Sequence, residues 1–502
     1  MVDIDGHSLT LDTFRDAVHG GEECRLRDEA RQRMQAAQDT VVRATERGEP
    51  VYGVNTGFGD LAGVNIPAEK LRLLQRRLVL SHCAGIGDPL PDAVVRGMLL
   101  LRANTLASGH SGARPLLVDA LLTLLNSNIL PLIPSRGSVG ASGDLAPLAH
   151  LAAVLLGDGE ATVEGKRRAA REALSAAGIE PLTLQAKEGL ALINGTQAMT
   201  SLLALAVIDA TRLAQLADLI GAMATDALRG TDTAFDPRLH EVRPHPGQRA
   251  SAANVWGLLQ GSQIRESHRS GDVRVQDPYS IRCIPQVHGA IRDIVDDVAR
   301  KVVIEMNAVT DNPLVFPEQD EILSGGNFHG EPMALGADIL AIAIAELGTI
   351  SERRIEKLTN TAFSGLPPFL IEDAGLNSGF MMAQVTAAAL ASENKTLCHP
   401  ASVDSIPTSA DKEDHVSMGM WAALKLHEVV RNTERILAIE LLCSAQGIDL
   451  LRPLRSSARI EALHKEFRQR IPTRASDREL SSEIASTVEF VQQLVEPLRE
   501  LR

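Results

Sequence analysis

The segment SMGMWAALKLHEVVRNTERILAIELLCSAQG, residues 417–447, is the stretch that decides the fold class. One mostly apolar set of side chains recurs in it at helical spacing, and charged side chains fall between them. The recurring set is Met420, Leu424, His427, Val430, Ile436, Ile439 and Leu442, and the charged set is Lys425, Glu428, Arg431 and Arg435. The pattern predicts one long amphipathic helix whose charged side chains face away from the core.

The same spacing recurs at 197–228, 333–360 and 481–501, so we predict a mainly α fold. Long helices this rich in alanine can approach one another closely, which favours a central bundle that also packs against other subunits. Strand signals are short and lie beside turn residues, at 161–166 and 313–325. We expect small hairpins there.

The domain organisation follows from a change of pattern near residue 210. Residues 1–210 alternate glycine-rich segments with short helices, whereas long helices dominate residues 211–502. Neither a repeat of 20–50 residues nor a low-complexity linker is visible. Long irregular stretches usually carry function, and they fall at 229–250, 307–332 and 361–380.

Composition excludes several classes of protein. The chain has 502 residues with 50 Lys and Arg against 64 Asp and Glu, and the net charge of −14 opposes a nucleic-acid partner. Five widely spaced cysteines are typical of reduced thiols. The first residues lack the pattern of a secretory signal, and charges interrupt the apolar runs that approach membrane length. We therefore expect a cytoplasmic protein that does not bind membranes.

The densest unusual segment is GSVGASGDLAPLAH, residues 137–150. Its glycines permit a tight backbone, in which the amide nitrogen of Gly143 can attack the carbonyl of Ala141. Two dehydrations then give a 4-methylidene-imidazol-5-one ring, and Ser142 supplies the methylidene carbon. An ordinary glycine-rich loop is the alternative, because the chain holds a second Ala-Ser-Gly at residues 107–109 that is typical of a helix C-cap. The tripeptide alone leaves both interpretations open.

Two other kinds of site fit the sequence less well. GHSGA at 109–113 nearly forms the G-x-S-x-G elbow of a hydrolase, but Ala113 replaces its last glycine and the surrounding pattern is helical. His240 and His245 are five residues apart in a proline-containing stretch, which is wrong for two metal ligands on one helical face. We predict no metal site.

The 137–150 segment resembles the signature of the aromatic amino acid ammonia-lyases, which make this ring themselves. Seven further segments resemble motifs of that family, in its order and across nearly the whole chain: VYGVNTGFGD (51–60), LVLSHCAGIGDPL (78–90), ALINGTQAM (191–199), QDPYSIRCIPQ (276–286), TDNPLVF (310–316), SGGNFHGEP (324–332) and SIPTSADKEDHVSMG (405–419). The match is closest to the histidine-specific members. It implies elimination of ammonia from L-histidine to trans-urocanate, with a phenylalanine or tyrosine ammonia-lyase or aminomutase as the alternative.

The resemblance also implies the site residues. The ring forms autocatalytically from Ala141, Ser142 and Gly143, without an external cofactor. Tyr52 removes the β-proton of the substrate, and Arg282 binds its carboxylate, for which a guanidinium fork is well suited. The implied catalytic residues are Tyr52, Ala141, Ser142, Gly143, Tyr279 and Glu413, and the implied substrate-binding residues are His82, Asn194, Gln276, Arg282 and Phe328. The resemblance also implies a homotetramer whose active sites are shared between chains.

The predicted substrate depends on His82 and Glu413. Imidazole carries one donor and one acceptor, which these two side chains can satisfy, whereas a phenyl ring would leave the carboxylate without a partner. The chain also departs from the usual histidine-specific pattern at Asp411-Lys412, Ile284 and His288, where Asn-Gln, Gln and Met are common. An acidic residue at a helix start is the alternative for Glu413, so the other aromatic substrates stay open.

Overall fold

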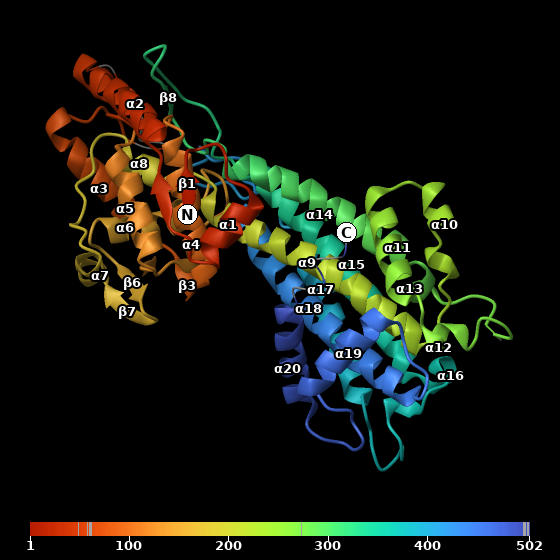
Figure 1. Cartoon of the computed structure of the whole chain (residues 1–502). Helices are drawn as coiled ribbons and strands as arrows, with labels where there is room; N and C mark the ends of the chain where they lie inside the picture. The colour runs from red at the N-terminus through yellow and green to blue at the C-terminus, as the bar shows by residue number, and fades with distance from the viewer. Residues whose placement is uncertain are drawn as a thin grey trace. The chain divides into compact units, whose positions relative to one another are not determined.

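A computed structural model describes residues 1–48, 50–57, 59, 63–272, 274–494, 498 and 501. The mainly α prediction is confirmed, because helices dominate the described residues and the strands are short (Figure 1). The chain divides into two compact units, and both are discontinuous in sequence. Unit 1 comprises residues 1–208, 299–338 and 400–424, and unit 2 comprises 209–298, 339–399 and 425–502. The division into consecutive domains 1–210 and 211–502 stays a prediction.

Unit 1 contains the shorter helices of the N-terminal half. They are α1 (Leu11–Val18), α2 (Asp28–Arg47), α3 (Leu71–His82), α4 (Asp92–Ala107), α5 (Pro115–Asn126), α6 (Leu145–Leu155), α7 (Ala170–Ala176) and α8 (Glu188–Ile193), with a 3₁₀ turn at Ala68–Lys70. Helix α4 is buried along almost its whole length and packs against α5. Helices α3, α6 and α8 pack against one another, so His82, the loop before α6 and Asn194 lie around one centre.

The strands of unit 1 form small separate sheets. Parallel β1 (Val2–Ile4) and β2 (Cys24–Leu26) make one, and antiparallel β3 (Ile86–Pro89) and β5 (Pro134–Arg136) make another. The predicted hairpins are confirmed as β6 (Glu160–Val163) with β7 (Lys166–Ala169), and β8 (Leu314–Phe316) with β9 (Glu321–Leu323). Strand β4 (Leu130–Pro131) extends the first hairpin by pairing with β6. Strands β1 to β5 were not predicted, because two to four residues are too few to show an alternating pattern.

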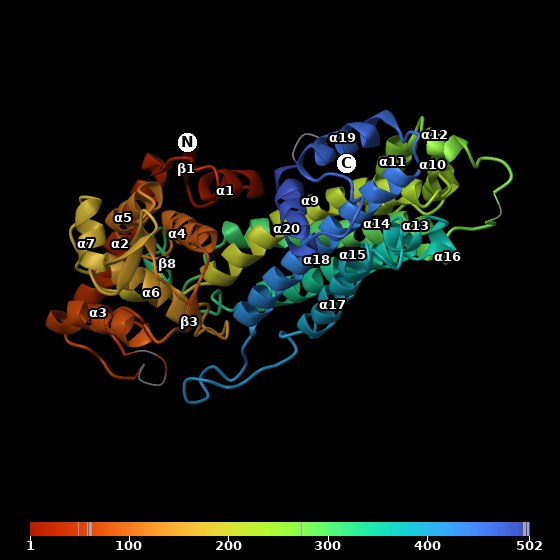
Figure 2. The ribbon, with the colours of Figure 1, turned by 90° about the horizontal axis from the view of Figure 1, so that it is seen from below.

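Four long helices have residues in both units: α9 (Gln197–Ala227), α14 (Ile284–Met306), α15 (Glu331–Thr359) and α18 (Gly419–Leu450). Within unit 2 they run side by side as the predicted bundle (Figures 1 and 2). Three of them match the predicted ranges closely, whereas the range 481–501 was too long because α20 (Leu480–Gln493) ends earlier. The rest of that range lies mostly outside the described residues.

The predicted faces of α18 are correct with one exception. Glu428, Arg431 and Arg435 are exposed as expected. Lys425 is only 3% exposed, and its ammonium group donates a hydrogen bond to the His399 carbonyl oxygen. The prediction that Lys425 faces away from the core was therefore wrong, because a carbonyl acceptor from another segment satisfies the buried charge.

The remaining elements of unit 2 cover its bundle. They are 3₁₀ turns at Thr233–Phe235 and Pro368–Leu370, together with α10 (Pro237–Glu241), α11 (Pro246–Leu259), α12 (Gln263–Glu266), α13 (Tyr279–Arg282), α16 (Thr361–Ser364), α17 (Met381–Leu397) and α19 (Ala458–Arg470). Buried polar pairs connect the long helices. Asp218 on α9 accepts hydrogen bonds from His288 and Arg292 on α14, and Arg354 on α15 pairs with Glu440 on α18.

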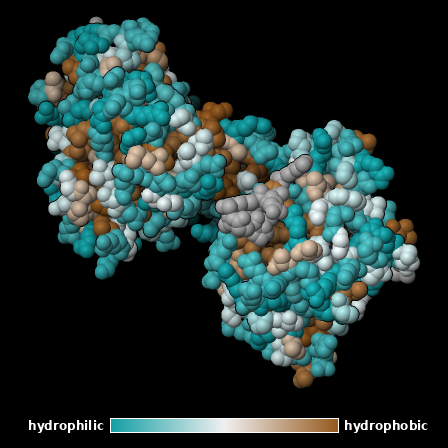
Figure 3. Space-filling view, in the orientation of Figure 1, coloured by the Kyte–Doolittle hydropathy of each residue, from teal (hydrophilic) through white to brown (hydrophobic). Residues whose placement is uncertain are grey.

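The apolar character of the long helices reflects their place in the core. Helix α15 is long and apolar enough to cross a membrane, but 67% of its most apolar window is buried inside the protein. On the face drawn in Figure 3, hydrophilic residues predominate over both units. All five cysteines are free, which confirms the prediction of unpaired thiols.

Candidate active site

The loop that precedes α6 has the tight backbone that its glycines predict. Gly140 and Gly143 have φ values of +68° and +69°, in the left-handed region that favours glycine. A Cβ on Gly140 would lie 2.3 Å from Ser417 Oγ, and one on Gly143 would lie 2.2 Å from the carbonyl oxygen of Gly195. Any other residue at either position would clash with its neighbour.

Asp144 ties this loop to the start of α9. Its Oδ2 accepts hydrogen bonds of 2.9 Å from the amides of Ala198 and Met199, and its Oδ1 accepts one of 2.8 Å from Ser138 Oγ. A carboxylate suits the positive end of a helix. Burial nevertheless raises the pKa of Asp144 to about 6, against the lowering effect of these hydrogen bonds. The loop and the N-terminus of α9 therefore form one hydrogen-bonded unit.

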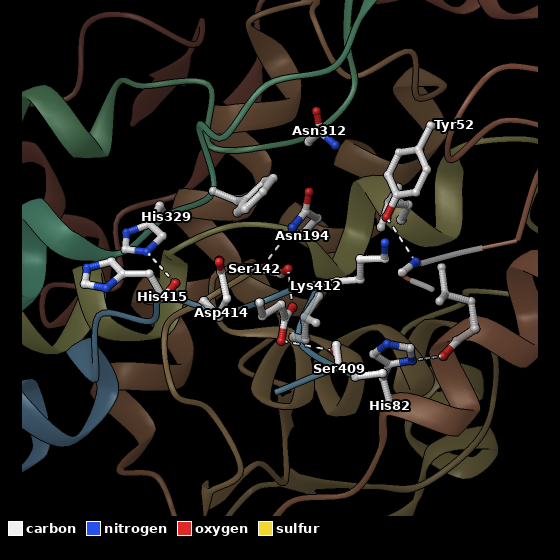
Figure 4. A pocket seen from close by; sticks show the side chains of 18 residues that line it. Tyr52, His82, Ser142, Asn194, Asn312, His329, Ser409, Lys412, Asp414 and His415 are labelled. Atoms are coloured by element: carbon white, nitrogen blue, oxygen red, sulfur yellow. Dashed lines mark hydrogen bonds between the residues drawn. The ribbon is translucent and has the colours of Figure 1, made fainter. Parts of the chain in front are cut away.

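A cavity of about 700 Å³ opens over the Ala-Ser-Gly tripeptide, and unit 1 supplies its whole lining (Figure 4). Its volume is in the usual range for small-molecule sites. The structure brings together here the predicted residues Tyr52, His82, Ala141, Ser142, Asn194, Phe328 and Glu413. Gly143 lies beside this lining, in the same loop as Ser142.

Glu413 reaches the tripeptide directly. Ser142 Oγ donates a hydrogen bond of 2.5 Å to Glu413 Oε1, and the hydroxyls of Thr408 and Ser409 donate to Oε2 at 2.5 and 3.1 Å. The turn that presents this carboxylate has three consecutive left-handed residues, Ser409, Ala410 and Asp411, a conformation that is strained for residues other than glycine. Helix α18 begins only at Gly419, so Glu413 is not a helix-start charge.

Asn194 and His82 are each oriented by a backbone carbonyl. Asn194 follows the last residue of α8, and its Nδ2 donates a 2.8 Å hydrogen bond to the carbonyl oxygen of Ser142. His82 ends α3, and its Nδ1 lies 2.8 Å from the Leu78 carbonyl oxygen. Because a carbonyl only accepts, Nδ1 carries the proton. Nε2 of His82 is then an acceptor when the ring is neutral.

Tyr52 and Phe328 supply the aromatic part of the lining. The phenol of Tyr52 points into the cavity, and its oxygen accepts a long hydrogen bond of 3.4 Å from the Gly59 amide (Figure 4). The motif around Tyr52 includes Phe58 and Asp60, which lie outside the described residues. Phe328 comes from the segment between β9 and α15.

The structure does not bring Gln276, Tyr279 and Arg282 into this lining. They belong to unit 2, and the described residues around the cavity include none of them. Tyr279 is 69% exposed, and the Arg282 guanidinium lies 4.5 Å from the centroid of its ring. Their roles at a substrate site stay predictions.

Several lining residues were not among the predicted site residues. His329 and His415 stack with ring centroids 5.9 Å apart, and His329 Nε2 donates to the His415 carbonyl oxygen at 3.2 Å. Asn312, Lys412 and Asp414 also line the cavity. All five lie in segments that resemble family motifs. Membership of these segments was the sequence signal for them, although no role was assigned to these positions.

Comparisons with known proteins agree with this fold. The model of the family described as aromatic amino acid lyase matches residues 9–469. A histidine ammonia-lyase of Anaeromyxobacter sp. (strain K) is 54% identical over 97% of this chain and 98% of its own. The solved structure of histidine ammonia-lyase from Trypanosoma cruzi is 45% identical, with a TM-score of 0.92 over 99% of this chain and 95% of that one.

Another solved structure, tyrosine aminomutase from Streptomyces globisporus, is 37% identical with a TM-score of 0.94 over the full length of both chains. The mainly α fold and the histidine ammonia-lyase relatives define an enzyme of the carbon–nitrogen lyase class. The chain belongs to the aromatic amino acid lyase family.

Proposed function

We propose that this enzyme eliminates ammonia from L-histidine to give trans-urocanate. The observation that carries the proposal is the hydrogen bond between Ser142 and Glu413, in a cavity that His82 also lines. It joins the residue that would provide an electrophile to a carboxylate that suits an imidazole substrate. Relatives more than 50% identical over nearly their whole length bear the name histidine ammonia-lyase, which supports the same reaction.

The electrophile in this proposal is a 4-methylidene-imidazol-5-one ring made from Ala141, Ser142 and Gly143. The nitrogen of Gly143 bonds to the carbonyl carbon of Ala141, and the Ala141 oxygen leaves as water with the amide hydrogens of Gly143 and Ser142. The Ser142 hydroxyl and its Cα hydrogen leave as the second water, so no oxidant is needed. The left-handed glycines and the absence of space for a Cβ at Gly143 fit such a ring. Once formed, it supplies an electrophilic methylidene carbon for removal of the amine.

The chain's own side chains bind the substrate and move its proton. Tyr52, which points into the cavity, takes the β-proton. Glu413 accepts a hydrogen bond from the substrate imidazole, and Nε2 of His82 faces the other ring nitrogen. A protonated His82 donates a hydrogen bond to the unprotonated nitrogen of a neutral substrate imidazole. A neutral His82 accepts a hydrogen bond from a substrate imidazolium. Four further residues belong to the proposed site because they match functional positions of the family: Gln276, Tyr279, Arg282 and Phe328.

A phenylalanine or tyrosine ammonia-lyase or aminomutase is the second candidate, because the tyrosine aminomutase fold matches over the full length. Glu413 favours histidine over phenylalanine, and the substrate panel separates histidine from tyrosine, whose phenol can donate a hydrogen bond to a carboxylate. A phenyl ring offers no donor to a carboxylate, which would then lose its hydration without compensation. Binding of imidazole avoids that penalty.

We also propose a homotetramer in which several chains contribute to each site. Helix α15 carries exposed apolar residues at helical spacing, Leu335, Ile339 and Ile342, and α17 carries Met382 and Val385. Apolar surface in this arrangement is typical of subunit contacts. The predicted location is the cytoplasm, and the predicted partners are the amino acid substrate and other copies of this chain. We propose no nucleic-acid or membrane partner.

A substrate panel tests the function. Purified protein is offered histidine, phenylalanine and tyrosine separately, and release of ammonia and of the conjugated acid is followed. The β-amino acid product is assayed in parallel to detect an aminomutase. Histidine should be turned over fastest and give urocanate with one equivalent of ammonia. Faster turnover of phenylalanine or tyrosine, or a β-amino acid as main product, would contradict the proposal.

A further inference from the structure

Arg102 is a fully buried arginine in the interior of unit 1. It lies on α4 and is 0% exposed. Its Nη1 donates hydrogen bonds of 2.9 Å to the carbonyl oxygen of Asn194 and to Oε1 of Gln197. Burial lowers the pKa of Arg102 to about 10, so the guanidinium is still charged at neutral pH. The Arg102 guanidinium is therefore hydrogen-bonded on both sides of the link, residues 194–196, that joins the end of α8 to the start of α9.

Gly195, in the middle of that link, has no room for a side chain. A Cβ on Gly195 would lie 2.4 Å from Arg102 Nη1 and 2.5 Å from the Thr310 carbonyl oxygen. The amide of Gln197 is fixed as well, because its Nε2 donates to Thr105 Oγ1 at 3.1 Å and Thr310 Oγ1 at 2.8 Å. Arg102 is therefore one of the side chains that pack against the link and hold its backbone in place.

The link contacts the tripeptide on its other side. The Gly195 carbonyl accepts a 2.7 Å hydrogen bond from the Asp144 amide, and Gly195 forms a parallel bridge with Gly143. Asn194 Nδ2 donates to the Ser142 carbonyl oxygen. The order in space is therefore the Arg102 guanidinium, the Asn194–Gly195 backbone and the Ser142–Gly143 backbone.

Filling this position with arginine is unfavourable for stability alone. Among the described residues, Nε and Nη2 of Arg102 have no hydrogen-bond partner. The buried carboxylate of Asp311 already pairs with Lys187 at 2.8 Å, and both side chains are fully buried. An unsatisfied buried donor usually costs about 1–3 kcal/mol, and an apolar side chain of similar volume would avoid that cost. The free energy of folding alone therefore does not account for the guanidinium.

We propose that Arg102 is a positioning residue for closure of the Ala141–Ser142–Gly143 ring. It holds the Asn194–Gly195 backbone against Gly143, so that the nitrogen of Gly143 stays close to the carbonyl carbon of Ala141 while two waters are lost. Arg102 is not among the residues that line the cavity, so it acts on the reaction through the link alone. The inference rests on the proposed self-made ring, and it assigns a function to a residue outside every segment that resembles a family motif.

The test measures ring closure by mass rather than by turnover. Wild-type chain, Arg102→Met and Arg102→Lys are expressed in a short pulse and purified, and the intact mass is followed over time. Each lost water removes about 18 Da. Closure should be at least tenfold slower in Arg102→Met and at least threefold slower in Arg102→Lys. Turnover per chain that has lost both waters should change less than closure does.

Asn104→Ala is the matched control, because Asn104 is a fully buried polar residue on the same helix. Its hydrogen bonds go to the Gly6 amide and the Met306 carbonyl oxygen, away from the link. This variant should melt at a lower temperature but close the ring at the wild-type rate. Wild-type closure in folded Arg102→Met overturns the inference, as does wild-type closure in Arg102→Lys if the methionine variant does not fold. A wild-type chain that never loses water would instead overturn the proposed function.

Discussion

Ser142 Oγ donates a hydrogen bond to Glu413 Oε1 at 2.5 Å, although 271 residues separate the two in sequence. Two hydroxyl groups, of Thr408 and Ser409, hold the other carboxylate oxygen of Glu413. The carboxylate is therefore fixed before any substrate enters, and its orientation does not depend on binding. In the proposed mechanism, this contact connects the group that forms the electrophile with the group that selects the substrate.

Replacing Glu413 by glutamine should lower kcat/KM for histidine. The amide keeps the size of the side chain but loses a charge-assisted hydrogen bond, which contributes about 1.5–3 kcal/mol, or roughly 10- to 150-fold in rate. Steady-state kinetics of Glu413→Gln with histidine measure the effect. The control is Glu428→Gln, since Glu428 is an exposed carboxylate on α18. Equal kcat/KM in Glu413→Gln and wild type would remove Glu413 from the substrate site.

Alanine at Gly143 should prevent ring closure and destabilise the fold. Its φ of +69° alone costs a residue with a side chain about 1–3 kcal/mol, and a Cβ would collide with Gly195. Gly178→Ala is a matched control, because Gly178 has a φ of +68° and open space around its Cα. Thermal melting and intact mass are measured for both variants. If Gly143→Ala melts and loses water like Gly178→Ala, the close contact with Gly195 has no role.

The titration of His288 should lower the stability of the fold as the pH drops below about 6.5, the ordinary pKa of histidine. Burial lowers the pKa of His288 although Asp218 opposes the shift, so below that pH the unfolded chain binds a proton that the folded chain does not. One such proton changes the free energy of unfolding by about 1.4 kcal/mol per pH unit. Denaturant unfolding between pH 5 and 7 measures the slope.

His288→Met should flatten this slope, whereas substitution of the exposed His7 by glutamine should not. The remaining slope is a balance, because burial lowers the pKa values of His150, His240 and His268 but raises those of Asp144 and Asp226 to about 6, which stabilises the fold as the pH falls. An unchanged slope in His288→Met would show that this histidine binds its proton equally in both states.

Glutamate at Ile342 should disrupt the proposed tetramer. The side chain is 45% exposed on the apolar stripe of α15, and a buried, unpaired carboxylate at a subunit contact is strongly unfavourable. Light scattering should give a smaller species, with loss of turnover if several chains contribute to each site as proposed. Leu239→Glu is the control, since Leu239 is 51% exposed on α10, away from the stripe. A tetramer of normal mass in Ile342→Glu would exclude this stripe from the assembly.

The sequence predicted three of the four long helices and most of the segments that line the cavity, because both depend on local signals. Periodic apolar residues defined α9, α15 and α18, and motif segments contained Tyr52, His82, Asn194 and Glu413. Contacts between distant segments carry no such signal. The sequence around Lys425 does not predict its hydrogen bond to the His399 carbonyl. The sequence around Arg102 does not predict its hydrogen bond to the carbonyl of Asn194, 92 residues away. Packing of the whole chain determines those pairs.

The mass of the tryptic peptide that begins at Gly137 and ends at Lys166 is the most direct test of whether Ala141, Ser142 and Gly143 form the ring. In protein that releases ammonia from histidine, the account predicts this peptide about 36 Da below its encoded mass, because two waters have left the Ala-Ser-Gly tripeptide. Ser142→Ala should give neither that full loss nor turnover. An active enzyme whose peptide has the full encoded mass would show that turnover does not need the ring.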